Sequence, residues 1–227
     1  MTSQALFDFD KSFNKTIIGT DEAGRGPGAG GVFAAAVYFD KITDGLISDL
    51  AILNDSKKLT AKKRDSIFDV IKNNTINKIV CVEVDEIEQL NILNASLKAM
   101  NLACCDVIER IRKDNILTLV DGNKLIRNYT YPQNFVIKGD AKSASIAAAS
   151  ILAKVSRDRY MEKLDEEFPN YSWRKNAGYL TADHLKAIDK FGLTKYHRPS
   201  FLKKHFEKQD KQTVGEDAQI IFLYALP

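Results

Sequence analysis

The sequence has few cysteines, no long apolar run and little net charge. Cys104 and Cys105 are adjacent and Cys81 stands alone, so the thiols form no CxxC motif and cannot all pair within one chain. This usage favours a reducing cytoplasm with buried, free thiols. No segment reaches the ~20 consecutive apolar residues of a membrane span. Residues 1–11 lack the basic start and apolar core of a secretory signal, so we expect a soluble cytoplasmic protein.

The net charge is only +3, because 33 basic residues are nearly balanced by 30 acidic ones. The basic residues do gather in two groups, which are Lys57, Lys58, Lys62, Lys63 and Arg64, and then Arg174, Lys175, Lys195, Arg198, Lys203 and Lys204. Such groups can neutralise nucleic-acid phosphates, although solvated helix faces have the same composition. On charge alone, a non-catalytic nucleic-acid-binding module is therefore one interpretation of the chain.

The spacing of the apolar residues predicts an α/β fold. Short apolar or alternating runs predict strands at residues 15–20, 32–39, 78–84, 116–120 and 135–137. Helical spacing or an alanine-rich composition predicts helices at residues 60–73, 95–113, 143–168 and 181–191. A chain of 227 residues can bury one sizeable core. We therefore expect one α/β core with a C-terminal helical extension.

Acidic residues follow three of the predicted strands, beside a glycine or a polar turn. They are Asp21, Glu22, Asp121 and Asp140. Singly, an acid after a strand is more often a turn or helix cap, but strand ends are also where α/β proteins build sites. Carboxylates gathered there repel one another, so the arrangement makes sense if divalent cations lie between them.

Carboxylate oxygens favour Mg²⁺ or Mn²⁺ over zinc, and the cysteine and histidine spacings offer no competing zinc site. Two such ions ~3.5 to 4 Å apart can activate water and stabilise the leaving oxygen of a phosphodiester. The pattern therefore indicates a metal-dependent nuclease. Side chains alternate along a strand, so Asp21 and Glu22 can face one way only if the backbone turns there, which Gly24 makes easy.

Three glycines between the first two predicted strands suggest a different function. Gly26, Gly28 and Gly31 satisfy GxGxxG, the fingerprint of a dinucleotide-binding oxidoreductase, but that fingerprint must open a helix. Here the following residues favour a strand, which argues against an NAD site. The backbone amides of this glycine-rich turn could instead approach a sugar or phosphate closely, because no side chains stand in the way.

Several motifs in order along the chain resemble ribonuclease HII, a family of metal-dependent nucleases. They are GTDEAGRGP at residues 19–27, NDSKKLT at 54–60, VDGN at 120–123, KGDAKSASIAAASILAKVSRDRYM at 138–161, and GYLTADH with HRPSF at 178–184 and 197–201. Any one motif is modest evidence, but together they span most of the chain. The sister family, ribonuclease HIII, carries an extra N-terminal domain, for which we expect no room before Gly19.

The resemblance implies an RNase H-like fold, a mixed sheet flanked by helices. It suggests a catalytic core at residues 1–168, a helical subdomain that helps to hold the duplex at 169–208, and a tail at 209–227. By resemblance, the four acids named above are the catalytic and metal-binding residues. The segment Gly24, Arg25 and Gly26 matches the loop that recognises the ribose 2′-hydroxyl. Tyr179 matches the tyrosine that packs on the sugar at an RNA–DNA junction.

The implied activity is an endoribonuclease that cuts the RNA strand of RNA/DNA hybrids and also cuts 5′ to ribonucleotides embedded in duplex DNA. It would use two Mg²⁺ or Mn²⁺ ions and leave 3′-hydroxyl and 5′-phosphate ends. Lys57 and Lys58 would contact phosphates, although a solvated helix entry explains them nearly as well. We expect a monomer. The segment Gln219 to Tyr224 loosely resembles a sliding-clamp peptide, but we favour a closing strand or a tail over a clamp-binding role.

Three positions depart from the pattern of the family. Gly28 and Gly31 stand where bulkier residues or proline are common, and Leu180 follows Tyr179 where a small residue is usual. The acids and the Gly24–Arg25–Gly26 segment are intact, so the departures concern loop stiffness and junction preference rather than the reaction.

Overall fold

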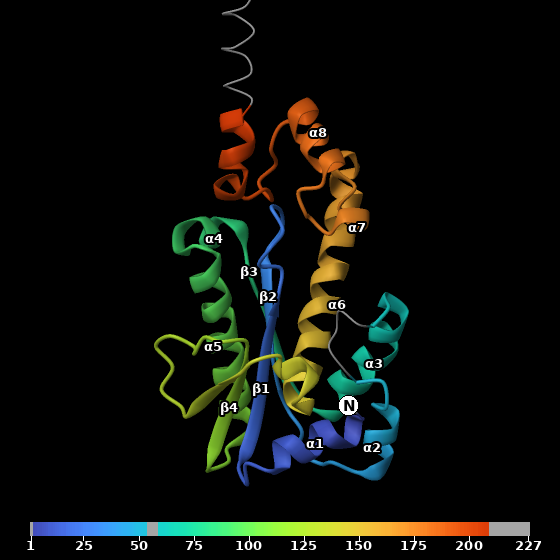
Figure 1. Cartoon of the computed structure of the whole chain (residues 1–227), viewed down its shortest axis with the longest axis vertical. Coiled ribbons are helices and arrows are strands. Elements are labelled where there is room, and N and C mark those ends of the chain that lie inside the picture. The colour runs from blue at the N-terminus through green and yellow to red at the C-terminus, as the bar shows by residue number, and fades with distance from the viewer. Residues whose placement is uncertain (1, 54–58, 209–227) are drawn as a thin grey trace, which may run out of the picture.

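The protein is built on one five-stranded mixed sheet, as the computed structural model of residues 2–53 and 59–208 shows (Figure 1). The strands are β1 (Thr16–Ala23), β2 (Val32–Tyr38), β3 (Ile76–Val82), β4 (Ile116–Asp121) and β5 (Gln133–Val136). Their order across the sheet is β3-β2-β1-β4-β5. The first three strands pair antiparallel, whereas β4 lies parallel to both β1 and β5. The predicted mixed α/β sheet is confirmed.

Two long helices cover the faces of the sheet, and Figure 1 shows the sheet between them. Helix α5 (Ile92–Ile111) packs on one face and α6 (Ala144–Glu167) on the other. Every residue of β2 is buried, because the strand is covered on both sides. Helix α6 approaches β1 closely at Gly19, where a Cβ atom would lie 2.2 Å from the carbonyl carbon of Ser145. Glycine at this position therefore brings the helix and the strand into backbone contact.

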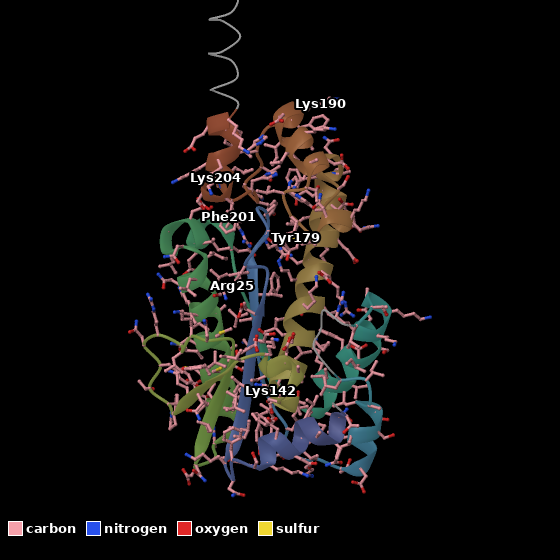
Figure 2. All side chains as sticks on the ribbon, in the orientation of Figure 1. Arg25, Lys142, Tyr179, Lys190, Phe201 and Lys204 are labelled. Carbon is pink, nitrogen blue, oxygen red and sulfur yellow. The ribbon has the colours of Figure 1, made fainter. Side chains whose placement is uncertain are left out.

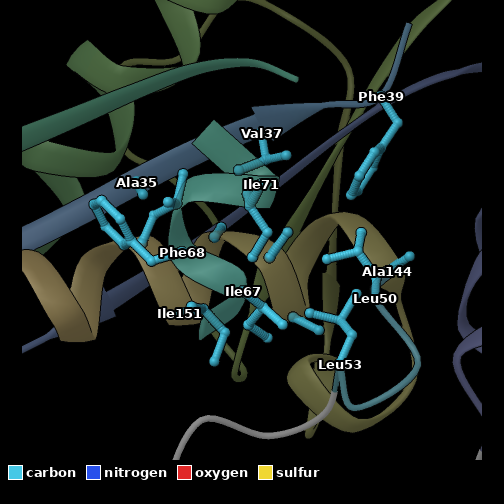
Figure 3. Close-up of a cluster of buried hydrophobic side chains, with 14 of the residues drawn as sticks. Ala35, Val37, Phe39, Leu50, Leu53, Ile67, Phe68, Ile71, Ala144 and Ile151 are labelled. Carbon is cyan, nitrogen blue, oxygen red and sulfur yellow. The ribbon is translucent and has the colours of Figure 1, made fainter. Parts of the chain in front are cut away.

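The core on the α6 face is extended by short helices (Figure 3). They are α1 (Ser3–Lys11), α2 (Asp44–Asp49) and α3 (Ala61–Asn74), which contribute buried apolar side chains such as Phe7, Leu46 and Ile71. Helix α1 also supports the start of α6, because Asp10 Oδ2 accepts hydrogen bonds from the Ser145 amide and hydroxyl, both at 2.8 Å. The N-terminal segment thus fixes the helix that follows Asp140.

A separate hydrophobic cluster forms where α6 extends past the end of the sheet. The 3₁₀ turn Pro169–Tyr171, α7 (Trp173–Asn176), α8 (Ala182–Phe191) and a last helical segment at residues 199–208 gather around the buried indole of Trp173. Ala29, from the turn between β1 and β2, is part of the same cluster. The C-terminal helices are therefore joined to the glycine-rich turn by a shared core.

Most of the predicted elements are confirmed, and the differences have local causes. Thr60, Ser143 and Thr181 cap α3, α6 and α8 with their side-chain oxygens. The prediction of a strand to residue 84 is wrong, because β3 ends at Val82 and Val84 begins helix α4 (Val84–Leu90), which carries Asp85 and Glu86 in its first turn. Helices α1 and α2 are absent from the sequence prediction. Within the described ranges, no helix is long and apolar enough to cross a membrane.

Candidate active site

Two of the acids lie side by side at the ends of neighbouring strands. Strands β1 and β4 run parallel, with Thr20 opposite Val120. The next residue along each strand is an aspartate, Asp21 in β1 and Asp121 in β4. Paired residues of parallel strands project from the same face of the sheet. Both carboxylates therefore lie on the face that α6 covers, at the edge where β4 ends.

Asp140 is brought to the same edge by the strand beyond β4. Strand β5 lies parallel to β4, with Val136 opposite Asp121. The Gly139 amide donates a hydrogen bond of 2.7 Å to Asp121 Oδ1, and Asp140 is the next residue, in the 3₁₀ turn that leads into α6. The backbone that carries one acid therefore orients another.

The carboxyl of Asp21 is almost fully buried, with 6% of the residue exposed. Burial raises its pKa well above the usual value, and the negative charges of Glu22 and Asp121 raise it further. A hydrogen bond from Ser150, on helix α6, works in the opposite direction. The three carboxylates are thus close enough to repel one another, and a cation between them would remove the repulsion.

Glu22 reaches the site from the opposite face of β1. Asp21 pairs with Ala35 and Glu22 with Ala34, so the strand stays regular through both acids and turns only after Ala23, where Gly24 has a φ of 102°. Glu22 Oε1 accepts a hydrogen bond of 3.1 Å from Arg25 Nη1. Glu22 and Asp121 both line a small cleft that also contains Asn123 and Lys124. A turn that points both acids one way is therefore not formed, and the two meet at the rim of the sheet.

The donor atoms of this cluster suit a hard divalent cation. All four candidate ligands are carboxylates, without a thiol or imidazole among them. In the described part of the chain, no three acidic, histidine or cysteine side chains are arranged as a ready-made metal site. The fit to a metal thus rests on the donor chemistry and on the mutual repulsion at Asp21.

The turn between β1 and β2, here called the glycine loop (residues 24–31), is hydrogen-bonded through its backbone carbonyls to two buried arginines. Arg157 and Arg198 are 2% and 0% exposed, and their guanidinium groups donate to backbone carbonyls. Arg157 bonds the oxygens of Gly31, Ala29 and Ala177 at 3.2, 3.0 and 3.0 Å, and Arg198 bonds those of Pro27 and Gly30 at 2.8 and 2.9 Å. At Gly24 a Cβ atom would lie 2.2 Å from Arg157 Nε, so the loop cannot carry a side chain there.

The sequence does not identify these two arginines as part of the site. The interpretation of Arg198 as one of a group of phosphate-binding or solvated cations is wrong, because its side chain is fully buried against the glycine loop. Arg157 lies in the alanine-rich helix α6, among positions that are otherwise occupied by buried apolar residues. Its position on that buried face is the one sequence feature that could have indicated a buried arginine. Strand β2 begins at Val32, as predicted, so the glycines open no helix and the NAD-binding interpretation is wrong.

Tyr179 lies against the glycine loop from the C-terminal side. A Cβ atom at Gly26 would be 3.2 Å from Tyr179 Cε1, and 52% of the tyrosine is exposed. In Figure 2, Tyr179 lies where the C-terminal helices meet the sheet, and Arg25, which follows the end of β1, lies below it in this view. Gly24, Arg25, Gly26 and Tyr179 are therefore brought together with Glu22. Lys57 and Lys58 lie outside the described residues.

Comparisons with known proteins agree with this architecture. The family profile described as "Ribonuclease HII" matches residues 18–209. A curated ribonuclease HII of Fusobacterium nucleatum is 46% identical over 209 residues, which are 92% of this chain and 95% of that protein.

Two solved structures share the fold at lower identity. The PCNA:RNase HII complex from Archaeoglobus fulgidus superimposes with a TM-score of 0.64 at 22% identity, over 81% of this chain and 93% of that one. The structure of Bst-RNase HIII in complex with Mn²⁺ gives a TM-score of 0.61 at 18% identity, over 84% of this chain and 65% of that one. From the family profile and the identity to a curated member, the chain belongs to the ribonuclease HII family and is a ribonuclease H.

Proposed function

We propose that this ribonuclease HII cuts the RNA strand of RNA/DNA hybrids and hydrolyses the phosphodiester 5′ to ribonucleotides embedded in duplex DNA, leaving 3′-hydroxyl and 5′-phosphate ends. The observation that carries the proposal is the meeting of acidic residues from adjacent strand ends directly beside the glycine loop and Tyr179. One part of this surface would hold the reacting phosphate, and the other would recognise the sugar next to it.

Asp21, Glu22, Asp121 and Asp140 would hold two divalent ions, Mg²⁺ or Mn²⁺. When bound, such ions supply an activated water and stabilise the charge on the leaving oxygen. The raised pKa of Asp21 supports this role, because a cation would favour its charged form. The Mn²⁺ complex of Bst-RNase HIII, which shares the fold, is in keeping with the proposal.

The chain itself would orient the ligands. Ser150 donates to the Asp21 carboxylate, and the Gly139 amide holds Asp121. Arg25 Nη1 lies 3.1 Å from Glu22 Oε1, so the residue that would bind near the ribose also contacts a proposed metal ligand. In this arrangement the recognition of ribose and the geometry of the metal site would depend on each other.

Recognition of the substrate would fall to backbone and aromatic groups. The amides of Gly24, Arg25 and Gly26 would contact the ribose 2′-hydroxyl, the group that separates RNA from DNA. Tyr179, half exposed above Gly26, would pack on the neighbouring sugar. Lys57 and Lys58 would contact phosphates of the duplex.

Replacing one acid separates catalysis from binding. We expect Asp21→Asn to reduce turnover with Mg²⁺ on the order of 10³-fold while leaving the affinity for the duplex largely intact. The substrate is a DNA duplex with one ribonucleotide, and an all-DNA duplex is the control. Cleavage by Asp21→Asn near the wild-type rate, or wild-type cleavage of both duplexes, would show the proposal to be wrong.

Cellular setting and partners form a second part of the proposal. Cys81, Cys104 and Cys105 are free thiols, and burial raises the pKa of Cys104 to about 12, which suits a reducing cytoplasm. The related structure from Archaeoglobus fulgidus is a complex with PCNA. The segment Gln219–Tyr224, outside the described residues, would bind a sliding clamp in this protein, and the enzyme would be monomeric. Deleting residues 209–227 should then abolish clamp binding in a pull-down and leave cleavage of short duplexes unchanged.

A further inference from the structure

Leu180 occupies the space in which a side chain at residue 28 would lie. A Cβ atom built on Gly28 would be 2.6 Å from both Cγ and Cδ2 of Leu180 and 2.8 Å from its Cδ1. The φ of Gly28 lies outside the left-handed range, so other residues could adopt this backbone conformation. With Leu180 in this position, glycine is therefore favoured at residue 28 for room rather than for conformation. The bulky residue after Tyr179 and the missing side chain in the loop fit each other.

This contact connects the two segments that would recognise the sugar. Tyr179 lies on Gly26, and its neighbour Leu180 lies on Gly28, two residues farther along the glycine loop. The Gly28 amide also donates to the Gly178 carbonyl at 2.9 Å. Leu180 and Gly178 thus hold the loop on both sides of Tyr179.

The backbone of Tyr179 is fixed by a buried pair of neutral histidines. Trp173 Nε1 donates to His184 Nε2 at 3.0 Å, so the proton of His184 is on Nδ1, which donates to the Tyr179 carbonyl at 2.9 Å. His197 Nδ1 accepts from the Thr194 amide, so the proton of neutral His197 is on Nε2, which lies 3.2 Å from His184 Nε2. With the main chain anchored in this way, the contact with the loop remains to set the distance between the tyrosine ring and Gly26.

We propose that Gly28 and Leu180 are a specificity-determining pair, whose contact sets the spacing between the glycine loop and Tyr179 and thereby selects which phosphodiester beside a ribose is cut. This inference rests on the proposed function, in which the loop contacts one sugar and Tyr179 the next. Ordinary van der Waals contact begins near 3.4 Å, so a methyl group at residue 28 would displace Leu180 by about 0.8 Å. Misplacements of this size are large for a reacting geometry.

The test is a double-mutant cycle read out as cleavage position. The variants are Gly28→Ala, Leu180→Ala and the double variant, with Gly45→Ala as a matched control, because a Cβ at Gly45 meets only Thr43 Oγ1 at 3.8 Å. The substrates are DNA duplexes with one ribonucleotide and with a short ribonucleotide tract. Product lengths give the share of cuts at the RNA–DNA junction, and kcat and KM are measured for each position.

We expect Gly28→Ala to reduce the share of junction cuts roughly fivefold, through kcat rather than KM, and Leu180→Ala to broaden the cuts less. The double variant should return to within about twofold of the wild type, because the new methyl fits the space that Leu180 leaves. A merely structural contact would lower the thermal midpoint and slow all positions equally, without this recovery. If Gly28→Ala does not fold, Leu180→Ala still tests the pair, because this variant removes side-chain atoms and inserts none into the packed contact.

A Tyr179→Ala arm separates the two ways in which the idea can fail. If Tyr179→Ala leaves the cleavage positions unchanged, the role proposed for Tyr179 is wrong, and the inference is overturned with it. If Tyr179→Ala moves the cuts but Gly28→Ala and Leu180→Ala leave them at the wild-type positions, the proposed function stands and the pairing alone is overturned.

Discussion

Replacing Arg157 by methionine should destabilise the protein and loosen the glycine loop. The guanidinium is 2% exposed and donates to three backbone carbonyls, two in the loop and one just before Gly178. Each hydrogen bond from a charged donor contributes ~1.5–3 kcal/mol, and methionine would leave the carbonyls buried without that donor. Relaxation and entry of water recover part of this, so we expect a loss of ~3–5 kcal/mol in the free energy of unfolding.

The measurement is urea unfolding with linear extrapolation, together with cleavage of a single-ribonucleotide duplex. The matched control is Arg159→Met, two residues along the same helix, where the arginine is half exposed and pairs with the exposed Asp65 at 3.2 Å. An exposed pair of this kind contributes under ~1 kcal/mol. We expect Arg157→Met also to lose discrimination between ribonucleotide and all-DNA duplexes, measured at a temperature where it is folded. A loss below ~1 kcal/mol with discrimination intact would refute the reasoning.

Three further outcomes follow from buried groups and from the acids. Burial lowers the pKa of His197 to about 4 in the folded protein, whereas in the unfolded chain this histidine takes up a proton near pH 6.5. The free energy of unfolding should therefore fall as the pH drops from 6.5 to 4, by up to ~1.4 kcal/mol per pH unit. The variant His197→Gln, which keeps a donor beside His184, should show a flatter pH dependence of unfolding. Gly19→Ala should lower the free energy of unfolding in urea by more than ~2 kcal/mol, because the new Cβ would lie 2.2 Å from the Ser145 backbone. The control Gly45→Ala should change it by no more than ~0.5 kcal/mol. Equal effects of the two substitutions would contradict the close contact between β1 and α6. EDTA should abolish turnover and added Mg²⁺ or Mn²⁺ should restore it; turnover that survives chelation would contradict a metal role.

Much of the sheet could be predicted because its strands are short apolar runs that stop abruptly. Residues 116–120 end at Asp121, and the alanine-rich segment begins at the cap Ser143, so both boundaries are local signals. The positions of the acids could be predicted from the same signals, since each one stands shortly after the end of a predicted strand. That parallel strands β1 and β4 bring Asp21 beside Asp121 depends on pairing, which the sequence indicated only through the general geometry of α/β folds.

The parts that were missed depend on partners far along the chain. Helix α1 spans only nine residues, and it is held by Leu6 and Phe7 in the core and by Asp10 on Ser145, 135 residues away. Arg157 and Arg198 have backbone carbonyls as partners, and carbonyls leave no mark in a sequence. Buried arginines of this kind cannot be told from surface cations by composition or spacing, because the loop that satisfies them is more than a hundred residues away.

The central claim is that four acids converge on divalent ions at the reacting phosphate. The most direct measurement is anomalous diffraction at the manganese edge from crystals of the protein with Mn²⁺ and a duplex containing one ribonucleotide. The account predicts manganese peaks in contact with oxygens of Asp21, Glu22, Asp121 and Asp140 and with the phosphate 5′ to the ribonucleotide. Manganese bound elsewhere, or a ribonucleotide phosphate placed away from these carboxylates, would contradict it.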